Sequence, residues 1–254
     1  MNNPAALPWY NLPQTRPTLD AMWEMIRGLL TAQGYAALPE RLSHALPYQT
    51  QWSNPQTLLS QCCGLDLAFP HSRSIEPVAV PVMGCLDSAP GTYYSVIIKR
   101  AHGQVPTRLK VAVNSKHSHS GHTNLYAWLH REGLVADAMM DTGSHQASSE
   151  AVRSGFADLA AIDAYTWQYL NQADLGVAAV SQSALAPPFV TGVASPIKSQ
   201  DLYAALDQAV HTLGRQIGWT GLRKCSRADY EPIARLAATL TVDEEHQAAV
   251  NQGP

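Results

Sequence analysis

The sequence lacks the motifs that mark several common kinds of site. Its four cysteines include no C-x-x-C pair, so the ligand spacing of a zinc site is absent. The chain also contains no H-E-x-x-H, no G-x-S-x-G elbow, no Walker loop and no G-x-G-x-x-G. We therefore expect neither a metal nor a cofactor, and assignments as a zinc protease, an α/β-hydrolase or a nucleotide-binding protein have no motif support.

Charged residues are scarce and show no excess of positive charge. They make up 15% of the 254 residues, and the formal net charge is −3 at pH 7. This balance gives no electrostatic footprint for a nucleic acid or an anionic membrane surface. No apolar run approaches the roughly 20 residues of a membrane span. The start, MNNPAALPWYNLP, has no basic region followed by an apolar one, so the sequence as written predicts a cytoplasmic location, and a periplasmic one if an export segment is missing.

Strand-like and helix-like segments alternate through the middle of the chain. Strands are expected at 109–113, 135–141, 159–162, 177–180 and 189–193. Helices are expected at 120–131, 144–155, 164–170, 198–217 and 226–240. Regular alternation predicts an α/β fold with a parallel sheet and right-handed connections. The chain is expected to pass out of one α/β unit and return to it.

The most informative stretch is VAVNSKHSHSGH, residues 111–122. An apolar run stops at Asn114, and a polar loop then precedes apolar residues at helical spacing. The loop places Ser118, His119, Ser120 and Gly121 where a helix begins. A helix start exposes about four unpaired N–H groups and carries roughly half a positive charge, so this loop is suited to hold an anion.

Two more polar clusters follow strands of the same unit. Thr142-Gly143-Ser144-His145 comes after the strand at 135–141, and Asp163 comes directly after the strand at 159–162. In open α/β sheets a ligand crevice lies beyond the carboxyl ends of the strands. We therefore expect the serine loop, His145 and Asp163 to line one crevice.

Each of these residues also has a purely structural interpretation. Ser144 suits a helix N-cap, His145 can face solvent, and Asp163 can cap the helix that follows it. The histidines at 117, 119 and 122 suggest a metal, but no carboxylate follows at ligand spacing, so no metal is expected. A disulfide between Cys63 and Cys85 stays open, because it depends on export.

The same residues resemble a known family. NSKHSHSG is similar to the N-D-x-x-S-x-S-G loop of the PhnD-like phosphate/phosphonate substrate-binding proteins of ABC transporters. TGSHQASSEAVRSGFADLAAIDAYTW resembles the G-S-H-x-x-S…V…G-x-A-D-x-A-A-I-D segment of that family. LPWYNLP and WSNPQTLLSQCCG resemble its L-P-M-Y-D and W-x-x-P-x-L-L-x-S-Q-T-C-G stretches. The resemblance runs from about residue 5 to 195.

The resemblance implies the type 2 periplasmic-binding-protein fold, an α/β fold of two lobes with a ligand cleft between them. Each lobe is expected to be a mostly parallel sheet flanked by helices. The central lobe would span 98–190, and the outer lobe would combine 1–97 with 191–254.

The ligand-binding residues that the resemblance implies lie in both lobes. Those of the outer lobe are Tyr10, Gln61 and one of Tyr93 or Tyr94. Those of the central lobe are Ser118, His119, Ser120, Gly121, Ser144, His145 and Asp163. The serines, the histidines and the N–H of Gly121 would donate to phosphoryl oxygens, whereas Asp163 would accept from a protonated oxygen or an amino group. His119 stands where the family often has a small hydroxyl residue, so it is expected to influence which oxyanion fits.

The implied function is binding rather than catalysis. The protein would hold a small phosphorus oxyanion (phosphate, phosphite or phosphonate) as the solute-binding component of an ABC-type uptake system. Its expected partners are this small anionic ligand and an ABC permease, and the chain is expected to be a monomer. The alternative is a cytoplasmic enzyme or ligand sensor of the same fold that acts on a small anionic metabolite. In the enzyme, His145 and Asp163 would form an acid–base pair.

Overall fold

The computed structural model describes residues 3–69, 72–106 and 108–240, and the chain divides into two compact units. Unit 1 comprises Met1–Thr92 and Leu185–Tyr230, and unit 2 comprises Tyr93–Ala184 and Glu231–Pro254. The segments at the two crossings, β3 (Thr92–Tyr93) and β9 (Ala184–Leu185), pair as a two-stranded sheet. Residues 231–240 group with unit 2. The expected extents of the two lobes stay a prediction.

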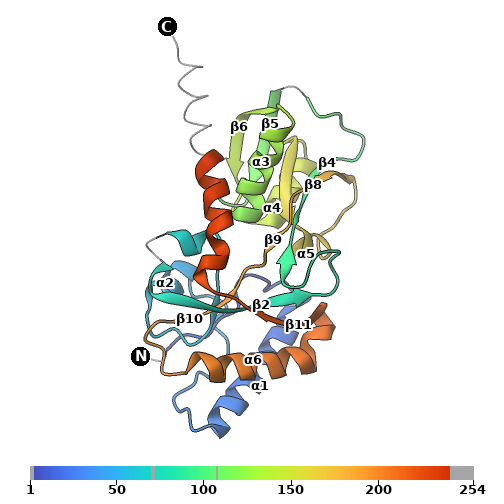
Figure 1. Cartoon of the computed structure of the whole chain (residues 1–254). Helices are drawn as coiled ribbons and strands as arrows, with labels where there is room; N and C mark the ends of the chain where they lie inside the picture. The colour runs from blue at the N-terminus through green and yellow to red at the C-terminus, as the bar shows by residue number, and fades with distance from the viewer. Residues whose placement is uncertain (1–2, 70–71, 107, 241–254) are drawn as a thin grey trace. The chain divides into compact units, whose positions relative to one another are not determined.

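Two long helices of unit 1 lie side by side, α1 (Arg16–Ala32) and α6 (Ser199–Leu213) (Figure 1). Pro17 occupies the first turn of α1, where a missing N–H leaves no hydrogen bond unmade. The buried face of α1 is formed by apolar side chains at helical spacing, namely Leu19, Met22, Trp23, Ile26 and Leu30. Short helical elements among the described residues of the unit include α2 (Tyr48–Ser53), η1 (Asp66–Ala68), η4 (Gly214–Ile217) and η5 (Arg227–Tyr230).

The sheet of unit 1 is antiparallel. Its strand order is β1-β10-β2-β11, with bounds Ser60–Gln61, Phe189–Gly192, Ile75–Met83 and Trp219–Lys224 respectively. Each of these neighbouring pairs is antiparallel, and the parallel contact among the described residues of the unit is an isolated bridge from Ala5 to Leu59. The expectation of a mostly parallel sheet in each lobe therefore does not hold here. A long connection permits either direction of pairing, and here β10 and β11, both distant from β2 in the chain, run antiparallel to it.

Unit 2 contains a mixed five-stranded sheet in the order β6-β5-β7-β4-β8. The bounds, in that order, are Val135–Asp141, Arg108–Val113, Leu159–Asp163, Ser95–Arg100 and Leu175–Val180. β5 pairs in parallel with β6 and β7, whereas β4 is antiparallel to both β7 and β8. The predicted parallel arrangement is thus present in the three strands that precede the polar clusters.

Helices cover both faces of this second sheet. α3 (Asn124–Arg131) packs against the face that includes Leu159 and Ala161 of β7, and α4 (His145–Arg153) packs against the face that includes Ala160 and Ile162. This alternation is the two-residue period of a strand that is buried on both sides. A short helix, α5 (Ala164–Trp167), follows β7 directly. The starts of α3, α4 and α5 therefore follow the carboxyl ends of β5, β6 and β7.

Several boundaries differ from those expected. β11 (Trp219–Lys224) was not expected, because it is a short strand between two amphipathic segments. The helix expected from 226 starts later, since Arg227–Tyr230 forms a 3-10 turn and helical conformation runs over 231–240, the last described residues. Cys63 is buried and Cys85 is exposed, and neither forms a disulfide. Across the described ranges, no helix is both long and apolar enough to cross a membrane.

Candidate functional site

The polar loop after β5 leads into a π-helical turn. This turn (η3, His119–Thr123) continues into α3. Ser118 caps it, because its Oγ accepts a hydrogen bond of 2.9 Å from the N–H of Gly121. Single π-helical turns are frequent at functional sites. The N–H of Gly121, which was expected to bind a ligand, is bonded to Ser118 in this structure.

Close packing explains the glycine in this turn. A β-carbon at Gly121 would lie 1.7 Å from Oδ1 of Asn114 and 2.9 Å from its Cγ. Asn114 follows β5 directly, so its amide occupies the space that a side chain at position 121 would need. Asn114 and Gly121 together fix the path of the loop.

Ser118, Ser120 and His145 form a continuous polar chain. The two serine Oγ atoms are 3.3 Å apart, and Oγ of Ser120 lies 3.0 Å from Nε2 of His145. His145 is the first residue of α4, so this chain joins the starts of two helices. The structure thus brings together the serine loop and the histidine that the sequence placed after different strands.

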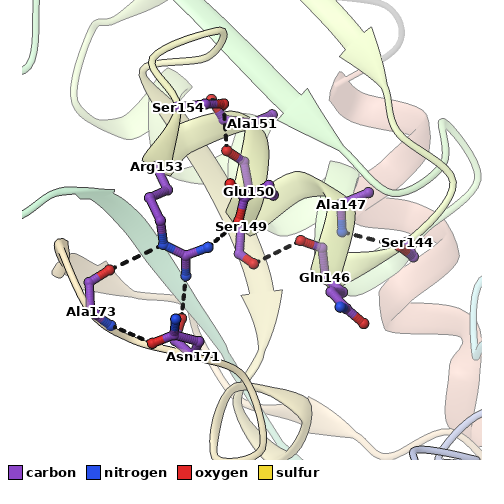
Figure 2. A network of polar contacts seen from close by, with 10 residues as sticks. All are labelled: Ser144, Gln146, Ala147, Ser149, Glu150, Ala151, Arg153, Ser154, Asn171 and Ala173. Carbon is purple, nitrogen blue, oxygen red and sulfur yellow. Dashed lines mark hydrogen bonds and ion pairs between the residues drawn. The ribbon is translucent and has the colours of Figure 1, made fainter.

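Helix α4 is anchored at both ends (Figure 2). At its start, Oγ of Ser144 accepts a hydrogen bond of 3.1 Å from the N–H of Ala147, so Ser144 is an N-cap. Near its end, Arg153 pairs with Glu150 and donates to the carbonyl oxygens of Asn171 and Ala173. These bonds tie α4 to the loop before β8. They limit the freedom of the helix that carries His145.

Both imidazoles of the site are neutral at pH 7. Burial lowers the pKa of His119 to about 4, and burial also lowers the pKa of His145 to about 4 although the carbonyl of Ala161 raises it. His119 is 2% exposed, and its ring centroid lies 6.2 Å from that of Tyr93. Nδ1 of His145 is buried even though the residue keeps some exposure. A neutral imidazole offers one donor and one acceptor, so neither histidine brings a positive charge.

Asp163 ends β7 and caps α5. Its Oδ1 accepts hydrogen bonds of 2.9 Å from the N–H of Tyr165 and 3.0 Å from the N–H of Thr166. The residue is 2% exposed. The capping interpretation of Asp163 is therefore correct, and it accounts for one of the two carboxylate oxygens.

Tyr93 and Tyr94 belong to unit 2, because the chain crosses between units at Thr92–Tyr93. Tyr93 is buried beside His119, whereas Tyr94 packs on the apolar cluster around Ala151 and Val152. Tyr93 therefore lies next to a residue of the serine loop.

Tyr10 and Gln61 belong to unit 1, and both are fully buried. The ring of Tyr10 meets that of Trp219 edge to face, with centroids 6.2 Å apart. Neither amide atom of Gln61 has a hydrogen-bond partner among the described residues. A buried amide without a partner is costly, so Gln61 is a candidate to contact a ligand.

Sequence reasoning missed two polar residues near this site, Ser95 and Asn124. Nδ2 of Asn124 donates a hydrogen bond of 3.0 Å to Oγ of Ser95, and both residues are buried. Two signals pointed to them. Ser95 opens the otherwise apolar run Ser-Val-Ile-Ile, and Asn124 lies one helical turn after Ser120.

The donors of the site are uncharged. Ser118, Ser120, His119 and His145 offer hydroxyl and imidazole groups, and Lys116, the cation of the loop, is exposed. Within the described ranges, no group of three or more histidine, cysteine, aspartate or glutamate side chains is placed to hold a metal. Neutral donors at two helix starts are suited to bind an oxyanion by hydrogen bonds.

The comparisons with known proteins agree with this chemistry. A family described as "ABC transporter, phosphonate, periplasmic substrate-binding protein" matches residues 67–234, about two thirds of the chain. No curated protein sequence matches the chain.

Solved structures match over nearly the whole chain. PhnD1 from Prochlorococcus marinus, solved in complex with methylphosphonate, is 14% identical with a TM-score of 0.70, over 94% of this chain and 98% of that one. A binding protein component of an ABC phosphonate transporter from Pseudomonas aeruginosa is also 14% identical with a TM-score of 0.70, over 94% and 87%. XAC2383 from Xanthomonas citri, solved with ATP, is 12% identical with a TM-score of 0.67, over 97% and 99%. At these identities the likeness establishes the two-lobed periplasmic-binding-protein fold.

Proposed function

Because the chain belongs to the periplasmic substrate-binding proteins of phosphonate ABC transporters, we propose that it binds a small phosphorus oxyanion through the serine loop and His145 of unit 2. The observation that carries this proposal is the polar chain from Ser118 through Ser120 to His145. Hydrogen bonds to charged groups contribute about 1.5–3 kcal/mol each. Four or five of them support an affinity of roughly −8 kcal/mol, which is micromolar, after the losses of association.

In the proposed complex the neutral donors surround the phosphoryl oxygens. Ser120 and Ser118 donate through their hydroxyl groups, and His119 and His145 donate through one ring N–H each. Ser144 supports the site as the cap of α4. Oγ of Ser118 accepts a hydrogen bond from the N–H of Gly121. On ligand binding, Ser118 either gives up this bond for one with the ligand, or keeps it as an acceptor while its hydroxyl proton donates to the ligand.

Asp163 sets the protonation state of the ligand in this proposal. Its Oδ1 accepts hydrogen bonds from two backbone N–H groups, and the carboxylate is proposed to accept a further hydrogen bond from the ligand. A carboxylate repels a fully ionised oxyanion but accepts a hydrogen bond from a protonated oxygen or an amino group. The proposed ligand is therefore a partly protonated oxyanion or an aminophosphonate.

Tyr93, Tyr10 and Gln61 complete the proposed set of ligand contacts. Tyr93 supports the site from beside His119. Gln61 is proposed because its buried amide would gain partners from the ligand. Tyr10 is proposed from the resemblance of its LPWYNLP stretch to the family.

As a member of this family the protein is a substrate-binding component rather than an enzyme, and its partners are a small ligand and a permease. The acid–base alternative with His145 and Asp163 is therefore withdrawn. We further propose that this chain acts in the periplasm, as the family description indicates, and that it works as a monomer.

Calorimetric titration tests the proposed ligand class. Phosphate, phosphite, methylphosphonate and 2-aminoethylphosphonate are titrated into the purified protein, with sulfate as a fully ionised control. Binding of at least one phosphorus ligand at micromolar concentration, tighter than that of sulfate, is expected. Absence of both heat and a thermal shift with all four phosphorus ligands contradicts the proposal.

A further inference from the structure

We propose that Ser95 is a further ligand-binding residue and that Asn124 is a positioning residue that orients its hydroxyl group. This inference rests on the proposed function and adds a donor to the same site. It is drawn from the contacts of β4, β7, β8 and the start of α3 in unit 2.

The backbone N–H and carbonyl groups of Ser95 have hydrogen-bond partners other than its own side chain. Its N–H donates to Oγ of Ser181 at 2.9 Å, and its carbonyl oxygen accepts from the N–H of Ser181 at 2.8 Å. The residues that follow, Val96, Ile97 and Ile98, are buried and apolar. The fully buried hydroxyl of Ser95 is therefore a local exception in a hydrophobic strand, and buried hydroxyl groups need hydrogen-bond partners.

The sheet places this hydroxyl next to Asp163. Ser95 and Asp163 are directly opposite each other in the antiparallel pair of β4 and β7. Opposite residues of such a pair point to the same face, with β-carbons about 4.5–5.5 Å apart. Two residues further along, Ile97 and Ala161 are also opposite each other, and both belong to the apolar cluster under α3. Ser95 and Asp163 thus point to the α3 face at its polar end.

Asn124 fixes the direction of the Ser95 hydroxyl. Nδ2 of Asn124 donates to Oγ of Ser95 at 3.0 Å, so it occupies a lone pair of that oxygen. The hydroxyl then acts as a donor through its single proton. No interaction in the described part of the chain gives this proton an acceptor. A ligand oxygen beside Asp163 supplies one.

Asn124 also connects this donor to the serine loop. It is the first residue of α3, which continues directly from the π-helical turn that contains Ser120. The first turn of one helix therefore carries both the ligand donors Ser118 and Ser120 and the amide that orients Ser95. Ser95 supplies a further donor from the first residue of β4, whereas Ser118 and Ser120 supply theirs from the loop before α3.

Binding of methylphosphonate and inorganic phosphate to three variants tests this inference. Ser95→Ala is expected to weaken binding about 5- to 150-fold, the range for removing one donor to a charged group. Asn124→Leu is expected to weaken it by a smaller factor, because Ser95 keeps its hydroxyl but loses its orientation. The double variant is expected to bind no more weakly than Ser95→Ala alone, because Asn124 acts through Ser95.

Ser149→Ala is the matched control. Ser149 is a buried serine of the same unit, and its hydroxyl donates to the carbonyl oxygen of Gln146 within α4 at 2.8 Å (Figure 2). Its removal is expected to leave the dissociation constant within twofold. Ser95→Cys, with a weaker donor of similar size, is used if Ser95→Ala does not fold by circular dichroism, and it is expected to weaken binding in the same direction.

Two results overturn the inference, and they are distinguishable from failure of the proposed function. If Ser95→Ala, or Ser95→Cys in its place, binds within twofold of the parent while Ser120→Ala loses affinity, the site exists without Ser95. If the double variant binds much more weakly than Ser95→Ala, Asn124 does not act through Ser95. A parent protein that binds neither probe contradicts the proposed function itself.

Discussion

Nε2 of His145 lies 3.0 Å from Oγ of Ser120, although the two residues follow different strands of unit 2. The contact exists because β5 and β6 are parallel neighbours, so the segments that follow them leave the same edge of the sheet. It converts two separate helix starts into one polar surface. The contribution of this contact to ligand binding can be measured by substituting Ser120.

Ser120→Ala is expected to weaken oxyanion binding by about 1–3 kcal/mol, roughly 5- to 150-fold. The substitution removes a hydroxyl that contacts both Ser118 and His145, so it takes away one ligand donor and one hydrogen-bond partner of His145. Titration calorimetry with methylphosphonate measures the change, and Ser149→Ala is the control. An affinity equal to that of the parent protein would exclude the serine loop from the site.

The sequence predicted the polar side of unit 2 well, for a physical reason. Strand–helix alternation specifies parallel strands, and parallel strands bring their following loops together. The positions of Ser118, Ser120, His145 and Asp163 after three strands of the alternating segment were therefore enough to predict that they share one sheet edge.

The antiparallel sheet of unit 1 was not predictable in this way. β2 pairs with β10 and β11, which lie more than 100 residues later in the chain, and no local pattern encodes such a pairing. The Ser95–Asn124 bond has the same origin, since it joins a strand to a helix start across the fold. Ser118 caps the π-helical turn by accepting a hydrogen bond from the N–H of Gly121, and such turns are too rare to be expected from a sequence pattern.

Gly121→Ala is expected to lower the free energy of unfolding by about 1–3 kcal/mol, the usual cost of forcing an extra carbon into a packed region. The new methyl group would lie 1.7 Å from Oδ1 of Asn114, so that side chain or the loop must move. Chemical denaturation measures the change. Gly28→Ala is the control, because nothing lies within 4 Å of a β-carbon at that helical position.

The clash with Asn114 can be tested by a second substitution. Oδ1 of Asn114 accepts no hydrogen bond from the described residues, so Asn114→Ala removes the obstacle without breaking a bond to that atom. The double variant Asn114→Ala with Gly121→Ala is expected to be more stable than the sum of the single changes predicts. Simple additivity would show that the loop, and not Asn114, resists the methyl group.

Acid is expected to destabilise the protein through His119 and His145. The pKa of each lies at about 4 in the folded state, below the ordinary value of 6.5, so the unfolded chain binds more protons between these values. Stability is fully present above about pH 6.5 and falls by about 1.4 kcal/mol per pH unit for each histidine as the pH drops toward 4. Urea unfolding at pH 7.5, 5.5 and 4.5 measures this dependence.

His119→Gln is the informative variant for this dependence. Glutamine does not titrate, so the variant is expected to lose less stability than the parent between pH 6.5 and 4.5. The slope of its unfolding free energy against pH is expected to be smaller by about 1.4 kcal/mol per pH unit. The same slope in parent and variant would mean that His119 is protonated as easily in the folded state as in the unfolded chain.

Asp66 is expected to give the opposite pH dependence in unit 1. Burial raises its pKa from 3.8 to about 7, although a hydrogen bond from the backbone of Cys63 lowers it. The folded state therefore binds more protons than the unfolded chain between these values. The stability associated with the protonated carboxyl group is fully present below about pH 4 and is lost as the pH rises through 7.

Asp66→Asn separates this effect from the histidines, because the amide keeps the size of the side chain and removes its titration. The unfolding free energy of the variant minus that of the parent is expected to rise by about 2–4 kcal/mol from pH 4 to pH 8. A shift of one pKa unit corresponds to about 1.4 kcal/mol. Urea unfolding of both proteins at pH 4, 6 and 8 measures this difference. A difference that stays constant with pH would mean that the carboxylate of Asp66 reaches solvent or a cation in the folded protein, and that its burial in η1 imposes no cost on the charged form.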